Sequence, residues 1–470
     1  MIFPPQAGPL VPPANRSLRL DHPLTRPTFQ QALARRPIAP FQLVLVALLL
    51  LVLVIDGVDI QLLSLVAPVI IQEWAVQRAD FGPALAGALI GMSGGALLGG
   101  WLGDRFGRLP VLLLATFSFG LATALAGLTD SVASMTWLRI FSGIGFGAAA
   151  PNAIALASEW LPERARSQIT SLMSVGTPGG GMIGASLVLL ILPAWGWRVA
   201  FYACGALTVA LAALLLLVGR ESPAFLATRG RASKASETAR RCLGMDWEPV
   251  IPASQSAQAA PAGRFLTRGN LRLNIGAGLG FFAIAFVSYA FVAWTAVMLT
   301  GLGLPIDRAV VAVFCFNLAA VAVAVIAGFV MRHLGTRLVM AGASLLLCLA
   351  VCALALVLAL GTAAGNAPAV YLLTGAAGGF AGAAMASIYA MMAAGYPVAC
   401  RAAGLGFGMM LGRAGGIAAS FAGGHLLDLG GSGAWAFLGT LAAAALVGAG
   451  CAFVSDKHVP GTIGAPRRSE

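Results

Sequence analysis

The stretch from Phe41 to Ile71 limits what this chain can fold into more than any other stretch. It opens with an almost unbroken apolar run from Leu43 to Ile55 and is long enough to cross a bilayer as a helix. Asp56 and Asp59 lie in the middle of it. A carboxylate at hydrocarbon depth costs about 3 kcal/mol on insertion scales, so such residues are rare and face a bundle interior or an aqueous cavity. The stretch therefore predicts a membrane helix with a polar, functional face.

Two interpretations of the acids follow from this stretch. At positions i and i+3 they share one helical face, and Gly57 between them allows another helix to approach closely. A rise of about 1.5 Å per residue places Asp56 roughly 22 Å from Phe41, past the midplane of the bilayer. In the first interpretation the span ends near Ile55 and the acids lie on a solvated loop. The second is a proton-titrating or substrate-facing pair inside a transporter, and the apolar run at 62–71 favours it.

Composition places the whole chain in a membrane. Hydrophobic residues make up 59% of it and charged residues only 10%, which is typical of an integral membrane protein and not of a soluble domain. The 59 glycines suit closely packed membrane helices. Hydropathy predicts about twelve spans, at 41–68, 80–103, 109–129, 132–157, 167–192, 197–219, 271–299, 306–331, 336–360, 367–393, 401–427 and 433–455.

The connection at 220–270 is the only long one, and it is polar and basic. We therefore expect an all-α membrane protein with one six-helix half at 40–219 and another at 271–455. Residues 1–39 are rich in proline and arginine and predict a flexible tail, with a second tail at 456–470. The first hydrophobic segment starts too late and runs too long for a signal peptide.

The basic residues predict the orientation. The connections on one side of the membrane hold Arg105, Arg108, Arg164, Arg166, the cluster from Arg220 to Arg272, Arg332, Arg337 and Arg401. Those on the opposite side hold Arg78, Arg198 and Arg308, with Glu73, Asp80, Asp130, Asp307 and Asp428 beside them. The positive-inside rule then places both termini and the central connection in the cytoplasm.

Several classes of function are not supported by the sequence. The net charge of +12 comes from residues in alternate loops and tails, so we expect no nucleic-acid partner. The seven cysteines are scattered, without metal-binding spacing. No HExxH, GxSxG or P-loop motif supports an enzyme, and the two-halved layout disfavours a channel. We expect a monomer in a lipid bilayer with no metal and no cofactor.

A compact motif follows the second predicted span. Residues 99–108 read Gly-Gly-Trp-Leu-Gly-Asp-Arg-Phe-Gly-Arg. Gly99 and Gly103 let backbones touch, Gly107 permits a tight turn, and Asp104 can face a neighbouring helix N-terminus. The alternative is a plain basic turn. The motif resembles the signature loop of the major facilitator superfamily.

A weaker copy follows the eighth span, at 328–337. Aligning Gly335 with Gly107 places Arg332 where the first copy has Asp104. The separation is about half the chain, as expected for two parallel repeats. Because the second copy lacks the acid, a symmetric gate is in doubt.

Further motifs narrow the resemblance. The first-span sequence Asp-Gly-Val-Asp, the fourth-span stretches at 139–147 and 150–153, Glu-Ser-Pro at 221–223 and Gly412-Arg413 look like the aromatic acid:proton symporter branch. The resemblance covers nearly everything from about residue 40 to 455. It implies a bacterial inner-membrane importer of aromatic carboxylates, driven by co-transported protons, in which two six-helix halves rock around a central site. Asp56 and Asp59 are then the expected coupling residues.

The roles of two arginines and one acid need separate discussion. Arg413 lies about 18 Å into its span, near the midplane, and a buried arginine needs an anion. That anion is either the substrate carboxylate or a structural partner, such as a resting ion pair with Asp56 or Asp59. Arg139 lies nearer the outer surface, where it either contacts substrate or snorkels. Glu159 ends the fourth span beside the first signature turn, which favours a gate salt bridge.

Polar and aromatic residues elsewhere could line the cavity, although helix packing or an interfacial position explains each of them as well. These candidate substrate-binding residues are Asn152, Tyr289, Trp294, Asn317 and Tyr389. The residues expected to form the cytoplasmic gate are Asp104, Arg105, Arg108, Glu159, Gly99, Gly103 and Gly107.

A proton-coupled exporter of drugs or metabolites is the rival function. It would share the signature turn, the two halves and a membrane acid. Arg413 disfavours it, because an arginine suits an anionic ligand better than the cationic or neutral compounds that most exporters carry.

Overall fold

The computed structural model describes residues 29–34, 36–247, 266–361, 365–397 and 400–460. Within these ranges every regular element is a helix, and the one β-bridge, between Gly335 and Pro460, joins no strands. The predicted all-α class is confirmed.

The long helices fall into two groups along the chain. The first half contains α2 (Pro40–Glu73), α3 (Arg78–Phe106), α4 (Arg108–Ala126), α5 (Val132–Trp160), α6 (Glu163–Ser174) and α7 (Gly176–Val218). The second half contains α10 (Leu271–Gly301), α11 (Ile306–Leu334), α12 (Thr336–Leu360), α13 (Ala367–Gly395), α14 (Arg401–Leu427) and α15 (Gly433–Val454). Short helices are α1 (Phe29–Ala34), α8 (Pro223–Thr228), α9 (Ala232–Leu243), η2 (Arg268–Asn270) and η4 (Gly430–Ser432).

Ten helices in the described ranges are long and apolar enough to span a membrane. One of them, α7, has 43 residues, about 65 Å of helix and twice the thickness of a hydrocarbon core. Its backbone leaves the helical region at Gly196, where φ is +74°, so α7 crosses the membrane twice. With α14, which is richer in glycine, the fold has the twelve spans that hydropathy predicts. Their ends agree to within a few residues, except that the fifth span also includes part of α6.

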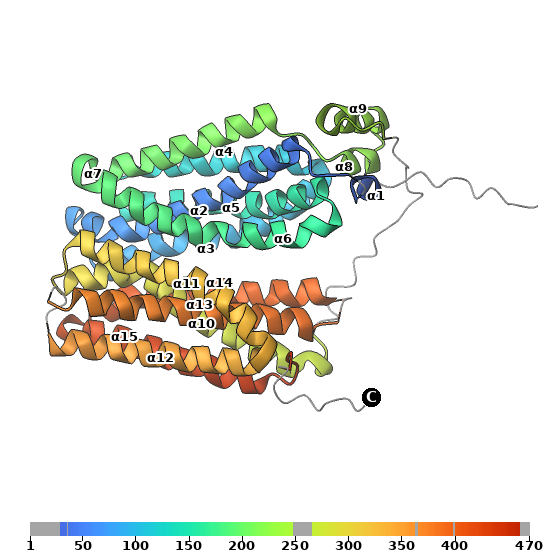
Figure 1. Ribbon diagram of the computed structural model, residues 1–470. Coiled ribbons are helices and arrows are strands. Elements are labelled where there is room, and N and C mark those ends of the chain that lie inside the picture. Colours follow the sequence, from blue (N-terminus) through green and yellow to red (C-terminus); the bar gives the residue numbers. More distant parts are fainter. Residues whose placement is uncertain (1–28, 35, 248–265, 362–364, 398–399, 461–470) are drawn as a thin grey trace, which may run out of the picture.

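The two halves form separate bundles that lie side by side (Figure 1). Each has its own apolar interior, with Leu49 and Phe201 fully buried in the first half and Leu347 and Leu441 in the second. The most closely packed pairs correspond between the halves: α3 with α5 matches α11 with α13. This correspondence is what two parallel repeats require.

The two ends of the bundle differ. The end that carries α1, α8 and α9 is named the loop side here, and the opposite end, with the short connections at 74–77 and 302–305, is named the turn side (Figure 1). Basic residues of the signature turn lie on the loop side. The first and last residues that the structure describes, 29 and 460, are also on this side.

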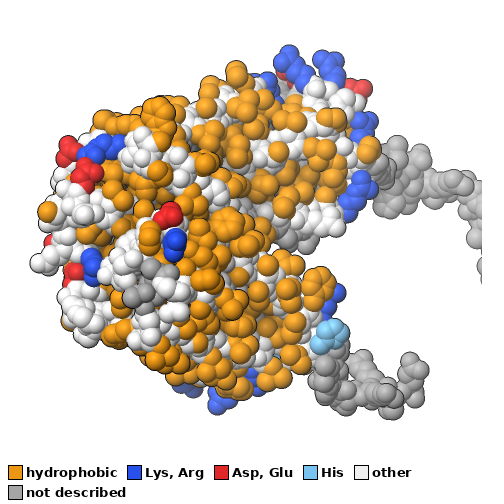
Figure 2. Space-filling model, turned by 60° about the vertical axis from the view of Figure 1, so that its left-hand side comes forward, with side chains coloured by type: hydrophobic (Ala, Val, Ile, Leu, Met, Phe, Trp, Pro, Cys, Tyr) orange, Lys and Arg blue, Asp and Glu red, His pale blue; other side chains and the backbone are white. Residues whose placement is uncertain are grey.

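The halves touch on the turn side and part on the loop side. A methyl group added to Gly424 of α14 would lie 2.6 Å from the main-chain oxygen of Arg78 on α3, and one added to Gly416 would lie 3.0 Å from Leu89. Gly100 and Gly406, on the loop-side ends of the same two helices, face open space. Figure 2 shows the corresponding hollow between the two lobes. The molecule is therefore closed on the turn side and open on the loop side.

One expectation about the N-terminal segment needs correction. Residues 1–28 lie outside the described ranges, but 29–34 form α1 rather than a flexible tail. Phe29 is 3% exposed because its ring packs edge-on against Trp160 at 6.1 Å and Trp247 at 5.2 Å. Trp247 belongs to the central connection, which also forms α8 and α9. An aromatic cluster drawn from three distant parts of the chain thus orders a segment that composition alone describes as loose.

Candidate functional site

A buried ion pair joins helices of the first half. Arg139 on α5 donates from Nη1 to Oδ1 of Asp59 at 2.8 Å and from Nη2 to Oδ2 at 2.6 Å. Thr123 on α4 donates to the same Oδ1 at 2.9 Å. Each charged side chain is 2% exposed. Two parallel hydrogen bonds between a guanidinium and a carboxylate form a strong and geometrically specific pair, so Asp59 is fixed by residues of its own half.

This pair settles two of the alternatives that the sequence leaves open for this conformation. Arg139 does not snorkel, because it is enclosed in protein and paired. Asp59 is not the resting partner of Arg413. Counting residues along a helix gives the depth of a side chain but not the direction in which it points, so the sequence shows that Asp59 and Arg139 are deep without showing that they meet. A contact between Arg139 and substrate stays a prediction.

Asp56 lies one turn before Asp59 on α2 and is also 2% exposed. The hydroxyl of Thr177 on α7 lies 3.5 Å from its Oδ2. Asp56 forms no salt bridge with any other described residue, although Arg139 and Arg413 are within electrostatic range. Because α2 is helical without interruption from Pro40 to Glu73, the interpretation with both acids on a solvated loop is wrong.

Arg413 lies on α14 at the level where the two halves separate. Its Nη1 donates to the main-chain oxygen of Met92 on α3, across the halves, over a long 3.4 Å. On the loop side of this bond, the facing positions Gly100 and Gly406 are open. Arg413 is half-buried and has no carboxylate within salt-bridge distance among the residues that the structure describes. It is therefore a cation without a fixed counter-ion at the apex of the hollow.

Two tyrosines lie near Arg413. Tyr289 on α10 and Tyr389 on α13 are within its electrostatic range. The ring of Tyr389 packs edge-on against Phe281 at 5.0 Å and is 40% exposed. Gly412 and Gly416 make this arrangement possible, since a side chain at either position would overlap the ring of Phe281 or Tyr289. Glycines on α14 thus allow the rings of Phe281 and Tyr289 to pack against the helix that carries Arg413.

The other three candidate lining residues lie elsewhere. Asn152 donates to the main-chain oxygens of Gly99 and Ala148, both at 2.8 Å, and is 1% exposed. Trp294 is fully buried and donates to the main-chain oxygen of Ser420 at 3.1 Å. In this conformation both pack within one half, as the packing alternative describes.

Asn317 on α11 lies between the halves and not at the apex. Its Nδ2 donates to Oε1 of Gln61 on α2 at 2.9 Å. It is 7% exposed and packs beside Gly181 of α7. Sequence reasoning did not single out Gln61, although a glutamine in the second half of a membrane span is itself a signal.

The signature turn builds a charged network on the loop side. Arg108 contacts Asp104 at 2.5 Å and Glu159 at 3.3 Å, so one guanidinium joins the end of α3 to the end of α5. Arg105 is not part of this network, and its guanidinium lies 5.4 Å from the ring of Trp101. All of these groups belong to the first half, which means that the network fixes one half and does not bridge the two.

The glycines of the motif act as expected from their backbone positions. A side chain at Gly99 would overlap Ala148, and one at Gly103 would overlap Asn152, so both allow α3 and α5 to touch. Gly107 has φ of +113°, a conformation that other residues rarely adopt.

Glu221 completes the turn and was missed as a functional residue. Its Oε2 accepts the main-chain N–H of Leu109 at 3.0 Å, and its Oε1 accepts that of Ser222 at 3.0 Å. The carboxylate therefore caps the start of α4 from the far end of the half. Burial raises the pKa of Glu221 above its ordinary value. The Glu-Ser-Pro motif was visible in the sequence, but its contact with the turn was not.

The second turn has the same shape with different chemistry. Gly335 has φ of +81°, like Gly107. Main-chain atoms of Val459 take the place of Glu221: the Thr336 N–H donates to the Val459 oxygen at 3.0 Å, and the Val459 N–H donates to the Thr336 hydroxyl at 3.1 Å. Arg332, where the first copy has Asp104, lies 5.5 Å from the ring of Phe329.

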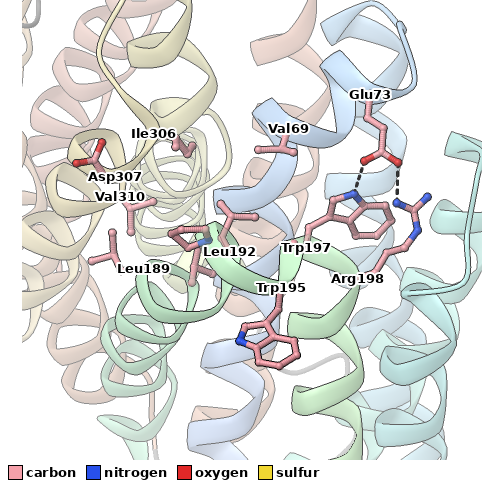
Figure 3. Close-up of a pocket in the computed structure, with 13 residues that line it drawn as sticks. Val69, Glu73, Leu189, Leu192, Trp195, Trp197, Arg198, Ile306, Asp307 and Val310 are labelled. Carbon is pink, nitrogen blue, oxygen red and sulfur yellow. Dashed lines mark hydrogen bonds and ion pairs between the residues drawn. The ribbon is translucent and has the colours of Figure 1, made fainter.

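A pocket of about 430 Å³ opens on the turn side, between the ends of α2, α7 and α11 (Figure 3). Glu73 accepts hydrogen bonds there from Trp197 at 2.7 Å and Arg198 at 2.6 Å. Arg198 also contacts Asp130 at 3.0 Å. Asp307 adds a further carboxylate to the pocket wall. Its charged lining is thus acidic overall, and its arginine is already paired.

Comparison with known proteins gives consistent results. A family model described as Major Facilitator Superfamily matches residues 49–360. The gallate transporter of Pseudomonas putida is 30% identical over 403 residues, which is 84% of this chain and 88% of the relative. The 4-hydroxybenzoate transporter PcaK of Pseudomonas aeruginosa is 30% identical over 408 residues, with the same coverage of 84% and 88%.

Solved structures share the fold. A D-xylose-proton symporter superimposes with a TM-score of 0.66 at 18% identity, covering 86% of this chain and 96% of that one. At this identity the likeness concerns the arrangement of the helices alone.

Proposed function

The chain belongs to the major facilitator superfamily, and on that premise we propose that it imports aromatic carboxylates together with protons by alternating access. Gallate and 4-hydroxybenzoate, after which two relatives at 30% identity are named, are both aromatic carboxylates. The same chemical class is therefore assigned to this chain. The two halves would rock about a central site that opens to one side at a time.

One observation carries the substrate assignment. Arg413 lies at the apex of the hollow, half-buried, with a single 3.4 Å hydrogen bond and no carboxylate partner among the described residues. A guanidinium at membrane depth requires an anion, and its planar fork matches a carboxylate. Tyr289 and Tyr389 beside it offer faces and edges for an aromatic ring. A ligand with a carboxylate on an aromatic ring satisfies both features.

The two acids of α2 have different surroundings, and we assign them different roles. Asp59 is held by two hydrogen bonds from Arg139 and one from Thr123, so we assign it to the fixed framework of the first half. Among the described residues, the side-chain partner of Asp56 is the hydroxyl of Thr177, at 3.5 Å. An ionised carboxylate that is buried without a counter-ion is costly, and a proton removes that cost. Asp56 is therefore the proposed carrier of the transported proton.

Proton coupling also has an electrical reason. An aromatic carboxylate is an anion at pH 7, and a cell interior that is negative opposes its entry by about 2.3 kcal/mol per 100 mV. One proton carried with each anion removes this cost and lets the pH gradient drive accumulation. A second would add the membrane potential as a driving force.

The distribution of basic residues supports an orientation with the loop side in the cytoplasm of a bacterial inner membrane. In that orientation the conformation described here is open to the inside, with the outer side closed. A monomer suffices, since both halves of one chain contribute to the site.

The pocket on the turn side does not suit this substrate. Glu73 and Asp307 repel a carboxylate, and Arg198 is already bound to two acids. Its volume is ample, but its charge has the wrong sign. These charges support our proposal that the substrate binds at Arg413 and not in the pocket.

Uptake of a panel of labelled aromatic acids into cells or vesicles, with and without a protonophore, tests the proposal. We expect accumulation of at least one hydroxylated benzoate that a protonophore abolishes. Accumulation that survives the protonophore would overturn proton coupling. Lower internal levels in expressing cells, restored by the protonophore, would instead identify an exporter.

A further inference from the structure

The halves meet at two places on the turn side. Between α3 and α14, Arg78 Nη1 donates to the main-chain oxygen of Leu427 at 2.9 Å, and the Ala79 N–H donates to Asp428 Oδ2 at 2.7 Å. The second place, called the seam here, lies where α2, α7 and α11 come together.

Toward the turn side of these helices, Val66 on α2 and Val313 on α11 are buried, at 0% and 1% exposed. The seam also holds two amides from opposite halves, Gln61 on α2 and Asn317 on α11. Asn317 Nδ2 donates to Gln61 Oε1 at 2.9 Å.

The third helix at this point leaves room for the amides. A methyl group added to Gly181 of α7 would lie 3.3 Å from Gln61 Oε1 and 3.3 Å from Asn317 Oδ1. One added to Gly184 would lie 3.4 Å from Cβ of Gln61. The pair therefore occupies space that exists because α7 has no side chain there, and its geometry depends on α2, α7 and α11 lying close together.

The position of the pair within the seam is also informative. The pocket of Figure 3 lies at the outer ends of the same three helices and includes Val69 and Val310. Gln61 is eight residues from Val69, and Asn317 is seven from Val310, which corresponds to about 10–12 Å of helix. The pair is thus separated from the outside by a short apolar stretch, and it lies five residues from Asp56 on the other side.

The hydrogen bonding of the pair is incomplete. Asn317 Nδ2 has a second partner, the main-chain oxygen of Val313 at 3.1 Å. Gln61 is 2% exposed, and its Nε2 has no partner among the described residues. A buried donor without a partner costs at least as much as one amide hydrogen bond gains. The closed seam is therefore held only weakly by this pair, and water entering an open seam would satisfy both amides.

From this geometry we propose that Gln61 and Asn317 form an amide latch that keeps the turn side closed and is released in every transport cycle. The latch forms only when the halves meet on the turn side, and it breaks when they part. Gln61 is then a positioning residue for transport, because it ties the helix that carries Asp56 to the opposite half. The importance of the latch for uptake rests on the proposed function, whereas closure of the seam does not.

Closure can be measured without any substrate. A single cysteine, Val313→Cys, in a variant whose seven native cysteines are replaced and whose unfolding temperature matches that of wild type, reacts with an impermeant maleimide from outside only when the seam opens. Met409→Cys, in the same background, is the matched probe for the other side. Met409 is 39% exposed and lies two turns from Gly416, on the same face of α14. Maleimide applied to inside-out vesicles labels it when the loop side is open.

Two sets of substitutions should change the labelling rate at position 313 in opposite directions. Gln61→Asn shortens the side chain, breaks the latch and keeps a polar group for water, so labelling at position 313 should rise about fivefold and labelling at 409 should fall. The pair Gln61→Leu and Asn317→Leu makes the seam dry, so labelling at 313 should fall below wild type. Exchanging the lengths, with Gln61→Asn and Asn317→Gln together, should restore both rates.

Each other outcome counts against the latch. Unchanged labelling in Gln61→Asn, faster labelling in the double leucine variant, or no rescue by the length exchange would overturn it. Because these rates are measured without substrate, a protein that fails to take up aromatic acids but shows the expected labelling would overturn the proposed function and leave the latch in place.

Discussion

Two deep arginines, one in each half, have opposite surroundings. Arg139 in the first half is 1% exposed and is bound by two hydrogen bonds to Asp59. Arg413 in the second half is half-buried, and its one side-chain hydrogen bond to a described residue is a long one, of 3.4 Å, to a main-chain oxygen. The same residue type thus serves as a fixed part of the framework in one half and as a free charge in the other.

The different surroundings of Arg139 and Arg413 indicate different roles for the two halves. A buried ion pair with two parallel hydrogen bonds gains little by meeting a ligand, since binding would first have to break those bonds. An arginine without a counter-ion gains an ion pair when an anion arrives. On the proposed function, the first half therefore holds the charges of the framework and the proposed proton carrier, and the second half presents the charge proposed to bind the substrate.

The largest effect should come from breaking the framework pair. Asp59→Asn leaves the Arg139 charge buried without its partner, and such changes typically destabilise a protein by about 3–5 kcal/mol. Thermal unfolding of detergent-purified protein should show a large loss, and uptake should be abolished. Replacing both partners, Asp59→Leu with Arg139→Leu, should restore much of the stability but not uptake. Equal stability of Asp59→Asn and wild type would contradict the framework role.

The next effect separates the two acids of α2. Asp56→Asn removes a carboxylate that has no salt bridge, so the folded protein should keep its stability to within about 1 kcal/mol. Uphill accumulation should be lost because the proton carrier is gone, while exchange of labelled for unlabelled substrate across the membrane continues. Normal accumulation by this variant would remove Asp56 from the coupling role.

A smaller effect on transport is expected from substitutions in the two glycine-containing turns, at Gly107 and Gly335. Asp104 is 68% exposed, and exposed ion pairs contribute little to stability, so Asp104→Asn should leave the amount of protein in the membrane near normal. It should lower the transport rate several-fold, since the network with Arg108 and Glu159 fixes the loop-side ends of α3 and α5. Arg332→Ala in the second turn should have a weaker effect. Similar rates for the two variants would show that the acid is not what distinguishes the turns.

The smallest effect concerns Glu221 and depends on pH. Its pKa is raised in the folded protein by burial, so folding favours its protonated form and this contribution to stability is lost as the pH rises above about 4.5. Glu221→Gln should therefore weaken the pH dependence of the unfolding temperature above pH 4.5. Identical curves for variant and wild type would show that the carboxylate is not buried in solution as described.

The sequence was sufficient for the architecture. Long apolar runs separated by short connections give nearly the right ends for eleven of the twelve spans, because the length needed to cross a bilayer leaves little freedom. The depth of Asp56, Asp59 and Arg413 followed from counting residues. The signature turn pointed to Asp104 and Arg108, since glycine spacing and charge are both visible in a linear string.

The sequence does not predict the contacts between distant segments. The bond between Asp59 and Arg139 depends on how α2 and α5 are rotated about their axes, which no single span reveals. The capping of α4 by Glu221 and the packing of Phe29 against Trp247 join residues more than one hundred positions apart. The proposed role of Gln61 depends on its hydrogen bond with Asn317, which the sequence does not predict.

Calorimetric titration of purified protein tests the contrast between the two arginines most directly. We expect wild type to bind 4-hydroxybenzoate and to bind 4-hydroxybenzamide at least tenfold more weakly, because the amide cannot form the ion pair with Arg413. Arg413→Lys keeps the charge but not the fork, so it should lose affinity for the acid nearly as badly as Arg413→Ala, with the unfolding temperature unchanged. Wild type binding acid and amide equally would contradict the account, and Arg413→Lys binding the acid as tightly as wild type would rule out two-bond recognition of the carboxylate.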